Sequence, residues 1–324
     1  MTRRRLAISS FVMLLVVVSA CGTDPPPVPD NPTPDAAHEL LVGESGQDFL
    51  DAVSTYAWAD HGARAGGLVN WIALDATSPN APTATRAGES ASAVARFLSD
   101  RGPGLLNIES GLLGQDHKTV GSLNPDLVQA FATALIPFQG AMVCDPRDTE
   151  GFTALADPCE AAVLAARPVF EVVGTDSTAA DAFANAAYTR MDDYLRAFAE
   201  NDPASASNPL PSALSYVGRL LGLVTVGLAG SGVTPPTVDQ VLVRARYTMV
   251  KAMLAKNPRL TFPPQYFHDG KLMSPNEVEP NLGVDMVDDY ALTLANFLIN
   301  NGNVEQMLTH NLRGQYELVA GGGK

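Results

Sequence analysis

The sequence contains few of the residues from which metal and catalytic sites are usually built. No H-E-x-x-H motif occurs, and no two histidines have the spacing that places zinc ligands on one helix face. There is also no G-x-S-x-G elbow and no G-x-x-x-x-G-K-[S/T] phosphate loop. No cofactor or metal ion is therefore predicted, although an active site assembled from distant residues is compatible with these absences. The five histidines are His38, His61, His117, His268 and His310.

Three short stretches come near to a catalytic pattern, and each has a simpler explanation. Residues 227–233, GLAGSGV, place a serine among glycines with no strand before it, and residues 110–120, SGLLGQDHKTV, hold Gly, His, Lys and Thr in the wrong order for a phosphate loop. Asp60 and His61, beside Trp58, could form half of an acid–base pair. Successive residues of a helix point in different directions, so a polar break on a helix is the favoured interpretation.

Basic residues are also scarce. The chain has 21 Lys and Arg against 35 Asp and Glu, a net charge of −14, and removal of Arg3, Arg4 and Arg5 with a signal peptide leaves 18 against 35, or −17. Such a body is an unsuitable partner for nucleic acid or for direct docking on anionic lipid. An acid cluster near the C-terminus could hold calcium, but it lacks the alternation of a known calcium loop; a solvated face is favoured here and for Asp192 with Asp193. The cluster is Glu277, Glu279, Asp285, Asp288 and Asp289.

Period-two alternation of useful length is absent, whereas apolar residues recur at helical spacing. Helix starts are predicted at Asn124-Pro125-Asp126 and at two capping boxes, Ser45 with Asp48 and Thr237 with Gln240. The predicted fold is all-α, a multi-helix array or bundle. Its expected core stripes are Ala91, Val94, Phe97 and Leu98; Leu127, Phe131, Leu135, Phe138 and Met142; Phe183, Ala187, Met191, Tyr194 and Phe198; and Val287, Tyr290, Leu294 and Phe297.

Prolines are expected inside or at the end of three helices. Pro137 should kink the helix that begins at Asn124, and Pro168 lies inside a predicted helix over Cys159–Val173. The helix through Phe97 is expected to end at Gly102-Pro103.

Long hydrophobic runs are rare outside the N-terminus. The most apolar stretch of the body is residues 214–232, LSYVGRLLGLVTVGLAGSG, in which Gly218 and Gly222 form a G-x-x-x-G pattern. Arg219 and several glycines interrupt this run. A buried helix with close neighbours is therefore favoured over a membrane span.

The N-terminus has the order of a secretory signal. Arg3, Arg4 and Arg5 precede an apolar run, residues 6–18, which is shorter than the roughly 20 residues that span a bilayer. Val18-Ser19-Ala20-Cys21 follows and resembles a bacterial lipobox. The resemblance implies that Cys21 carries a diacylglycerol and becomes the mature N-terminus; the alternative is an uncleaved membrane helix with an incidental cysteine.

The domain organisation follows from this signal and from the prolines. Residues 1–20 are the predicted lipoprotein signal peptide, and the lipidated Cys21 with the proline-rich segment up to residue 36 forms a disordered tether. The body is predicted as an N-terminal helical domain (37–200), a linker (201–212), a C-terminal helical region (213–319) and a short flexible tail (320–324).

Cysteine is scarce, with three residues in the chain. If Cys21 carries lipid, Cys144 and Cys159 remain as an even pair in an exported, oxidising setting, which predicts a disulfide. Two buried free thiols are the alternative. Closing a loop of that size is worth about 3 kcal/mol in the chain-entropy model.

Three segments resemble a known family. WADHGARAGGLVNWI (58–72), RAGESASAVARFLSD (86–100) and NPDLVQAFATALIPF (124–138) look like the helices of actinobacterial, largely mycobacterial, proteins described as containing a TPR repeat region. The likeness covers residues 48–199 and implies an α-helical array without assigned catalytic residues. The 34-residue tetratricopeptide pattern itself is not legible in the chain.

These observations lead to two main hypotheses. The first is a lipid-anchored protein on the outer face of the cell membrane, whose helical body binds a protein, a ligand or an envelope component. The second is a hydrolase-like envelope enzyme with a non-local active site; an accessory protein of a secretion or toxin system is suggested only by the resemblance. A cleft with a serine or aspartate beside His61, His117 or His268 would favour the enzyme, and exposed apolar patches along helices would favour partner binding.

Overall fold

A computed structural model describes residues 24–110, 116–147, 150–201, 211–232 and 234–321. Helices make up 69% of the structure and strands 3%, which confirms the all-α class. Two antiparallel hairpins, which the sequence did not predict, pair β1 (Ile108–Ser110) with β2 (Asp116–Lys118) and β3 (Phe267–His268) with β4 (Lys271–Leu272). The described α-helices are α1 (Pro34–Val42), α2 (Gly46–Thr55), α3 (Ala63–Gly66), α4 (Ile72–Asp75), α5 (Ala81–Leu105), α6 (Val120–Leu123), α7 (Pro125–Leu135), α8 (Gln139–Met142), α9 (Cys159–Ala165), α10 (Arg167–Val173), α11 (Ser177–Glu200), α12 (Pro211–Gly227), α13 (Val238–Lys256), α14 (Pro275–Leu282), α15 (Asp285–Asn300), α16 (Val304–Met307) and α17 (Gly314–Gly321).

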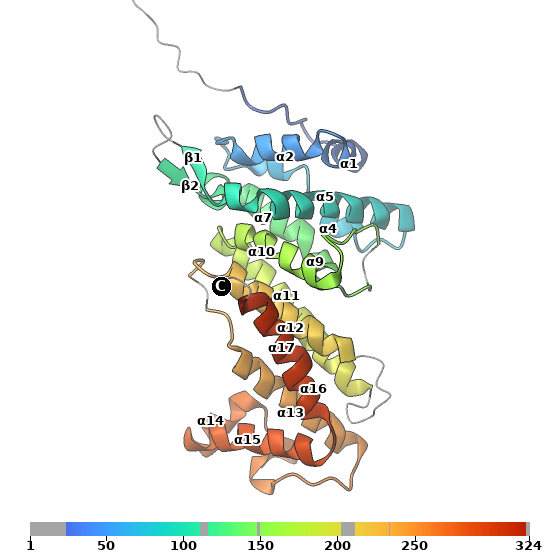
Figure 1. Cartoon of the computed structure of the whole chain (residues 1–324), viewed down its shortest axis with the longest axis vertical. Coiled ribbons are helices and arrows are strands. Elements are labelled where there is room, and N and C mark those ends of the chain that lie inside the picture. Colours follow the sequence, from blue (N-terminus) through green and yellow to red (C-terminus); the bar gives the residue numbers. More distant parts are fainter. Residues whose placement is uncertain (1–23, 111–115, 148–149, 202–210, 233, 322–324) are drawn as a thin grey trace, which may run out of the picture.

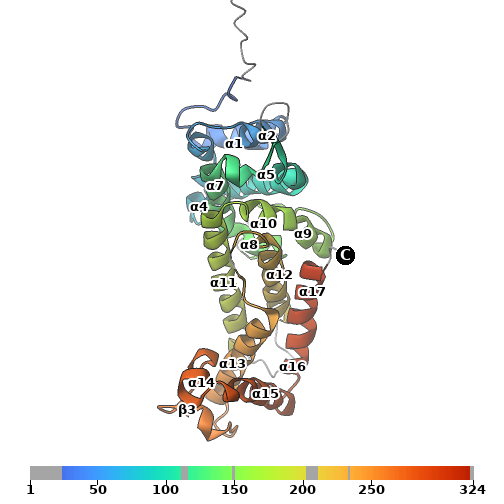
Figure 2. The ribbon, with the colours of Figure 1, turned by 90° about the vertical axis from the view of Figure 1, so that its left-hand side faces the viewer.

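The helices form an elongated stack (Figures 1 and 2). At one end α1 and α2 lie on α5, and α5 in turn packs on α10. The long helices α11 and α12 then run along the stack to α13, and α14 and α15 close the opposite end. A π-helical segment, Leu308–Arg313, leads into α17, which returns along α12. The two ends of the stack are therefore built by the first and the late helices of the chain.

The helix with Pro137 is interrupted as predicted, whereas the single helix predicted over Cys159–Val173 is divided into α9 and α10. The helix from Asn124 ends at Leu135, and a 3₁₀ turn over Ile136–Phe138 joins it to α8. Pro168 separates α9 from α10 because it sits in the first turn of the second helix, where its missing N–H has no helical partner to lose. The expected end at Gly102-Pro103 is wrong, since α5 continues to Leu105 with Pro103 in its last turn.

The predicted helix starts have mixed outcomes. Thr237 and Gln240 exchange both bonds of a capping box at α13. The box predicted for Ser45 and Asp48 is wrong: Ser45 has φ −94° and ψ 9° rather than the extended backbone of an N-cap, and its side chain makes no capping bond. A box that the sequence analysis did not identify forms at α14, between Ser274 and Glu277.

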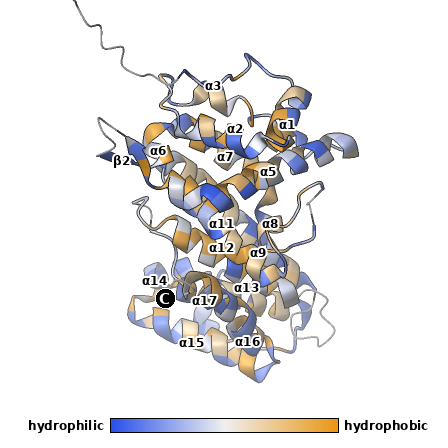
Figure 3. Cartoon of the chain, turned by 45° about the horizontal axis from the view of Figure 1, so that its top comes forward, coloured by the Kyte–Doolittle hydropathy of each residue, from blue (hydrophilic) through white to orange (hydrophobic). Residues whose placement is uncertain are grey.

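The apolar stretch after residue 213 forms the buried helix α12, along which hydrophobic residues run in Figure 3. Its G-x-x-x-G pattern permits close contact. A Cβ added to Gly218 would lie 2.1 Å from the Leu312 carbonyl oxygen, and one added to Gly222 would lie 2.6 Å from Cβ of Val319. Within the described ranges, no helix is both long enough and apolar enough to cross a membrane.

The hydrophobic core is continuous from Val28 to Val319. It does not stop at the predicted boundary between two helical domains, because α11 and α12 pack directly on each other. Most of the predicted linker lies outside the described residues, and its last two residues, Pro211 and Ser212, already belong to α12. All members of the four predicted core stripes are buried except Val287, which is half-buried.

The segment predicted as a tether is partly attached to the body. Val28 is 4% exposed, and its carbonyl accepts a 2.7 Å hydrogen bond from Nη2 of Arg64. Arg64 also forms a 2.9 Å ion pair with Asp30. Helix α1 begins at Pro34, inside the predicted tether, because Thr33 accepts a bond from Ala36 N and Pro34 suits the first helical position.

Candidate functional site

The predicted disulfide is present. Cys144 and Cys159 are bonded, with Cα atoms 6.1 Å apart. The bond joins the segment after α8 to the first residue of α9, and so closes an otherwise irregular loop onto the core. Cys21 lies outside the described residues, and its lipidation stays a prediction.

Asp60 and His61 lie in a turn before α3. The prediction that they form a polar break on a helix is therefore wrong. The two Asp60 oxygens accept from Gly62 N at 3.1 Å and from Arg64 N at 2.9 Å. His61 has φ 58°, in the left-handed region, and its carbonyl accepts from Asp126 N at 3.1 Å. Every oxygen of the pair is used to fix backbone, which explains the residues without acid–base chemistry.

The same turn is held by Asn124, whose side chain the sequence predicted as a helix cap. Instead, Oδ1 accepts from Trp58 N at 3.2 Å, and Nδ2 donates to the carbonyls of Ser54 and Tyr56 at 3.0 and 2.8 Å. Asn124 is completely buried, so these bonds replace its lost hydration. Its role is to join the end of α2 to the start of α7.

One histidine does contact a serine. Nδ1 of His38 lies 3.0 Å from Oγ of Ser90, and Nε2 lies 3.4 Å from Glu89. A nucleophile must reach its substrate, yet Ser90 is 0% exposed in the interface between α1 and α5. This contact therefore secures α1 on α5, and it does not supply the accessible Ser–His pair that a hydrolase needs.

A polar cluster surrounds the disulfide loop. Asp145 is 3% exposed, and its Oδ2 accepts from Nη2 of Arg147 at 2.9 Å and from the Tyr194 hydroxyl at 2.7 Å. The Arg147 guanidinium also lies over the Tyr194 ring, 5.3 Å from its centroid. The sequence analysis placed Tyr194 in the core but gave no signal for its polar partners, which come from a loop about fifty residues earlier.

The protonation of this cluster does not suit catalysis near neutral pH. Burial raises the pKa of Asp145, but hydrogen bonds from Arg147 and Tyr194 outweigh it and leave that pKa below its ordinary value. Burial, together with the bond to Asp145, raises the pKa of Tyr194 well above its ordinary value. A carboxylate with a lowered pKa is a weak base, and a phenol with a raised pKa is a weak acid. The cluster therefore fixes the position of the disulfide loop.

Arg219, which interrupts the apolar run of α12, is buried beside the disulfide loop. It donates to the Val143 carbonyl at 3.1 Å, to Sγ of Cys159 at 3.0 Å and to Oε1 of Gln315 at 2.7 Å. Burial lowers the pKa of the guanidinium, and the charge of Glu160 opposes that effect. One arginine therefore ties α12 to both sides of the disulfide and to α17.

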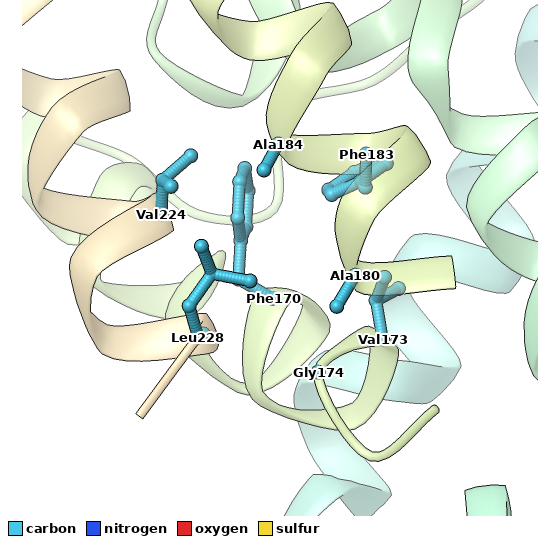
Figure 4. A pocket seen from close by; sticks show the side chains of 9 residues that line it. Phe170, Val173, Gly174, Ala180, Phe183, Ala184, Val224 and Leu228 are labelled. Atoms are coloured by element: carbon cyan, nitrogen blue, oxygen red, sulfur yellow. The ribbon is translucent and has the colours of Figure 1, made fainter. Parts of the chain in front are cut away.

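Two hollows were considered as ligand sites. The first lies between α10, α11 and α12, where Phe170 stands between Val224 and Leu228 on one side and Ala184 and Phe183 on the other (Figure 4). Its volume is about 10 Å³, roughly the space of a single water molecule, so it is a packing gap.

The second hollow is an open trough of about 390 Å³ beside the end of α5. The only arginine among its lining residues, Arg101, is already paired with Asp51 at 2.7 Å. Asp100 and Glu109 add further negative charge. The trough offers no converging set of unpaired donors and acceptors that would define a ligand.

The most distinctive surface is the outward side of α15. Three of the four most exposed large apolar side chains of the described residues lie on this helix or at its N-cap: Leu292 at 61%, Ile299 at 58% and Val284 at 69%. Asp285, Asp288 and Asn296 are exposed at positions that share one side of the helix with the first two. We call this surface the α15 face and define it as Asp285, Asp288, Leu292, Asn296 and Ile299.

The C-terminal acids that were considered for calcium have separate roles. Glu277 closes the cap of α14 through the N–H and hydroxyl of Ser274, and Asp289 accepts a bond from the Tyr266 hydroxyl. Asp285 and Asp288 belong to the α15 face. In the described part of the chain, no group of three or more His, Cys, Asp or Glu side chains has the geometry to hold a metal ion.

Comparison with known proteins adds no precedent. The family resemblance noted in the sequence therefore stays a prediction, and function has to be argued from the surfaces and bonds described above. No protein-family model, curated protein or solved structure matches the chain.

Proposed function

We propose that the protein is a cell-envelope lipoprotein, anchored at the outer face of the membrane through Cys21, whose helical body binds a protein partner. The anchor is inferred from the sequence alone, from the signal and the lipobox-like Val18-Ser19-Ala20-Cys21. Two acyl chains or more on one residue would provide the stable attachment that a single chain does not. The chain is acidic overall, which disfavours direct attachment to anionic lipid.

The observation that supports the binding role is that the chain enters the stack at one end and α15 lies at the other. The described chain begins at the end of the stack that α1 and α2 form (Figure 1), and Val28 is its first buried residue. The α15 face lies at the opposite end (Figures 1 and 2). Only residues 21–27 separate the proposed lipid from that first contact, so the tether would hold the near end at the membrane and present the α15 face away from it.

The enzymatic alternative has weaker support. Among the described residues, the one Ser–His contact buries its serine completely, and hydrogen bonds lower the pKa of the buried Asp145, away from general-base behaviour. Burial raises the pKa of Asp192, but that carboxylate is held in an ion pair with Arg244. Exposed apolar residues on a helix are instead typical of surfaces that bind another helix.

Metabolic labelling tests the anchor. Cells that express the full-length chain are fed a clickable palmitate, and we expect label on the wild type and complete loss of it in Cys21→Ala. A Cys144→Ser/Cys159→Ser variant is the matched control, because it removes two cysteines and should keep the label. An unlabelled wild type that retains its first twenty residues in the soluble cell interior would refute the anchor.

A further inference from the structure

We infer that the α15 face is the docking site for an amphipathic helix of a partner protein, one with apolar residues in its N-terminal half and Lys or Arg in its C-terminal half, running antiparallel to α15. This inference rests on the proposed binding function and does not depend on the lipid anchor. It follows from the order of residues along the face, from their charge and from the helix dipole.

The apolar part of the face has the spacing that helix pairing uses. Leu292 and Ile299 are seven residues apart, which is one heptad, and both are more than half exposed. Their neighbours Tyr290, Leu294 and Phe297 point into the core and are buried. The helix is thus fixed on one side by its packing, and the described residues leave a second apolar stripe, Leu292 and Ile299, exposed.

The acidic part of the face has no basic partner either. Residues 275–300 contain five carboxylates and no Lys or Arg. Some acids elsewhere form ion pairs with an arginine of a neighbouring helix, as Asp192 does with Arg244 and Glu305 with Arg246, whereas the described part of the chain supplies no ion pair for Asp285 or Asp288. Charge complementarity therefore selects a basic partner and disfavours an anionic lipid surface.

A second copy of the chain does not complete this face. Leu292 lies midway between Asp285 and Ile299, so an antiparallel self-pairing would put Asp285 of one copy against Ile299 of the other and would bury carboxylates without partners. A parallel self-pairing would place Asp285 and Asp288 against the same acids. Both arrangements are unfavourable at this surface.

The direction of the partner helix follows from the dipole. On α15 the acids are in the first turns, where the helix N-terminus favours negative charge, and the apolar residues follow. A partner that runs antiparallel places its C-terminal turns against Asp285 and Asp288, and Lys or Arg is favoured in those turns by the same effect. A parallel partner would need its basic residues at its own positive end, which is unfavourable.

Synthetic peptides test this inference on the full mature protein in detergent. The first peptide is an 18-residue helix former with leucines at heptad spacing in its N-terminal half and lysines in its C-terminal half, labelled for fluorescence anisotropy. The second has the two halves in reverse order, and the third replaces the lysines with glutamates. We expect the first to bind at least tenfold more tightly than either control, and its affinity to fall with added salt.

Two variants locate the site. Leu292→Lys should weaken binding of the first peptide at least tenfold, while Leu74→Lys, which changes the most exposed large apolar residue of the described chain, on α4, should leave it unchanged. Equal binding of all three peptides, or an unchanged affinity in Leu292→Lys, would overturn the inference. Self-association through this face in sedimentation, or binding to anionic vesicles that Leu292→Lys abolishes, would also overturn it. Because palmitate labelling is read independently, a labelled protein that fails these tests keeps its proposed anchor and loses only the docking site.

Discussion

The helices in the centre of the stack (α10, α11, α12 and α17) are packed differently from those at the end opposite α1 and α2, which we call the distal end (α13, α14 and α15). In the centre, α12 packs on α11 and lies against α10 and α17 at distances that only glycine permits. Hydrogen bonds of Arg219 and Asp145 add to the disulfide there. At the distal end, α13, α14 and α15 enclose an aromatic cluster. Its ring pairs have centroids 4.7 Å apart for Tyr266 with Tyr290 and 5.6 Å apart for Phe262 with Phe297.

This difference means that the central helices contribute mainly to stability, whereas α15 keeps a side that is free to bind a partner. Helix α12 is covered on several sides, and an added Cβ at Gly218, Gly222 or Gly227 would collide with a neighbouring segment. Helix α15 is covered on one side only, since its aromatic and leucine residues face inward while Leu292 and Ile299 remain exposed. Substitutions should therefore be costly in the centre and tolerated on the α15 face, and this expectation can be tested position by position.

The largest effect is expected at Gly218. In Gly218→Ala the new Cβ would lie 2.1 Å from a backbone oxygen of Leu312, which cannot move aside as a flexible side chain could. We expect the free energy of unfolding to fall by more than about 2 kcal/mol, as measured by urea denaturation.

Gly314→Ala is the matched control. Gly314 is a helical residue, with φ −60° and ψ −39°, and nothing lies within 4 Å of an added Cβ. The same substitution should here stabilise the protein by about 0.5 to 1 kcal/mol, because alanine restricts the unfolded chain. Equal effects at the two glycines would contradict the close contact between α12 and the segment before α17.

Much of this central packing could be predicted from the sequence, because it depends on local patterns. The G-x-x-x-G at Gly218 and Gly222 predicted close neighbours, Pro137 predicted the interruption after α7, and Cys144 with Cys159 predicted the disulfide. Each of these signals is a property of a few adjacent residues or, for the disulfide, of an even cysteine count. Helix class and core stripes follow from periodicity for the same reason.

The remaining features depend on contacts that no local pattern specifies. Asn124 was expected to cap its own helix, but its side chain bonds to residues about seventy positions away. The hydrogen bond between Tyr194 and Asp145 joins a loop to α11, and the outward positions of Leu292 and Ile299 depend on which side of α15 the other helices cover. Periodicity identified the inner stripe of α15 correctly and gave no sign that a second apolar stripe would stay exposed.

A smaller effect is expected at Asp145, which the central region keeps ionised although it is buried. Asp145→Asn retains the volume but loses the charge that accepts from Arg147 and Tyr194. We expect a loss of about 1.5 kcal/mol in the free energy of unfolding at neutral pH, of the size found for hydrogen bonds to charged groups.

The pH dependence identifies the cause. The pKa of Asp145 is lower in the folded protein than its ordinary value of 3.8, so its contribution to stability is present above pH 3.8 and is lost as the pH falls through the lower, folded-state pKa. The difference between wild type and Asp145→Asn should therefore be constant near neutral pH and shrink in acid. A difference that is unchanged by acid would show that the carboxylate charge is not what stabilises the loop.

The smallest effects should come from a pair of tyrosines, one in each region, that the same substitution affects in opposite directions. At the distal end the buried Tyr266 donates its hydroxyl to Asp289, so Tyr266→Phe should cost about 1 kcal/mol. In α11 the Tyr188 hydroxyl is buried without a hydrogen-bond partner among the described residues, so Tyr188→Phe removes a desolvation penalty and should be neutral or stabilising. Burial also raises the pKa of Tyr188, because the phenolate form would lose its hydration. Denaturation midpoints of the two variants, measured side by side, should therefore shift in opposite directions or by clearly unequal amounts. Two equal losses would mean that the Tyr188 hydroxyl has a partner, such as a bound water molecule, and that this part of the central region is as fully hydrogen-bonded as the distal cluster.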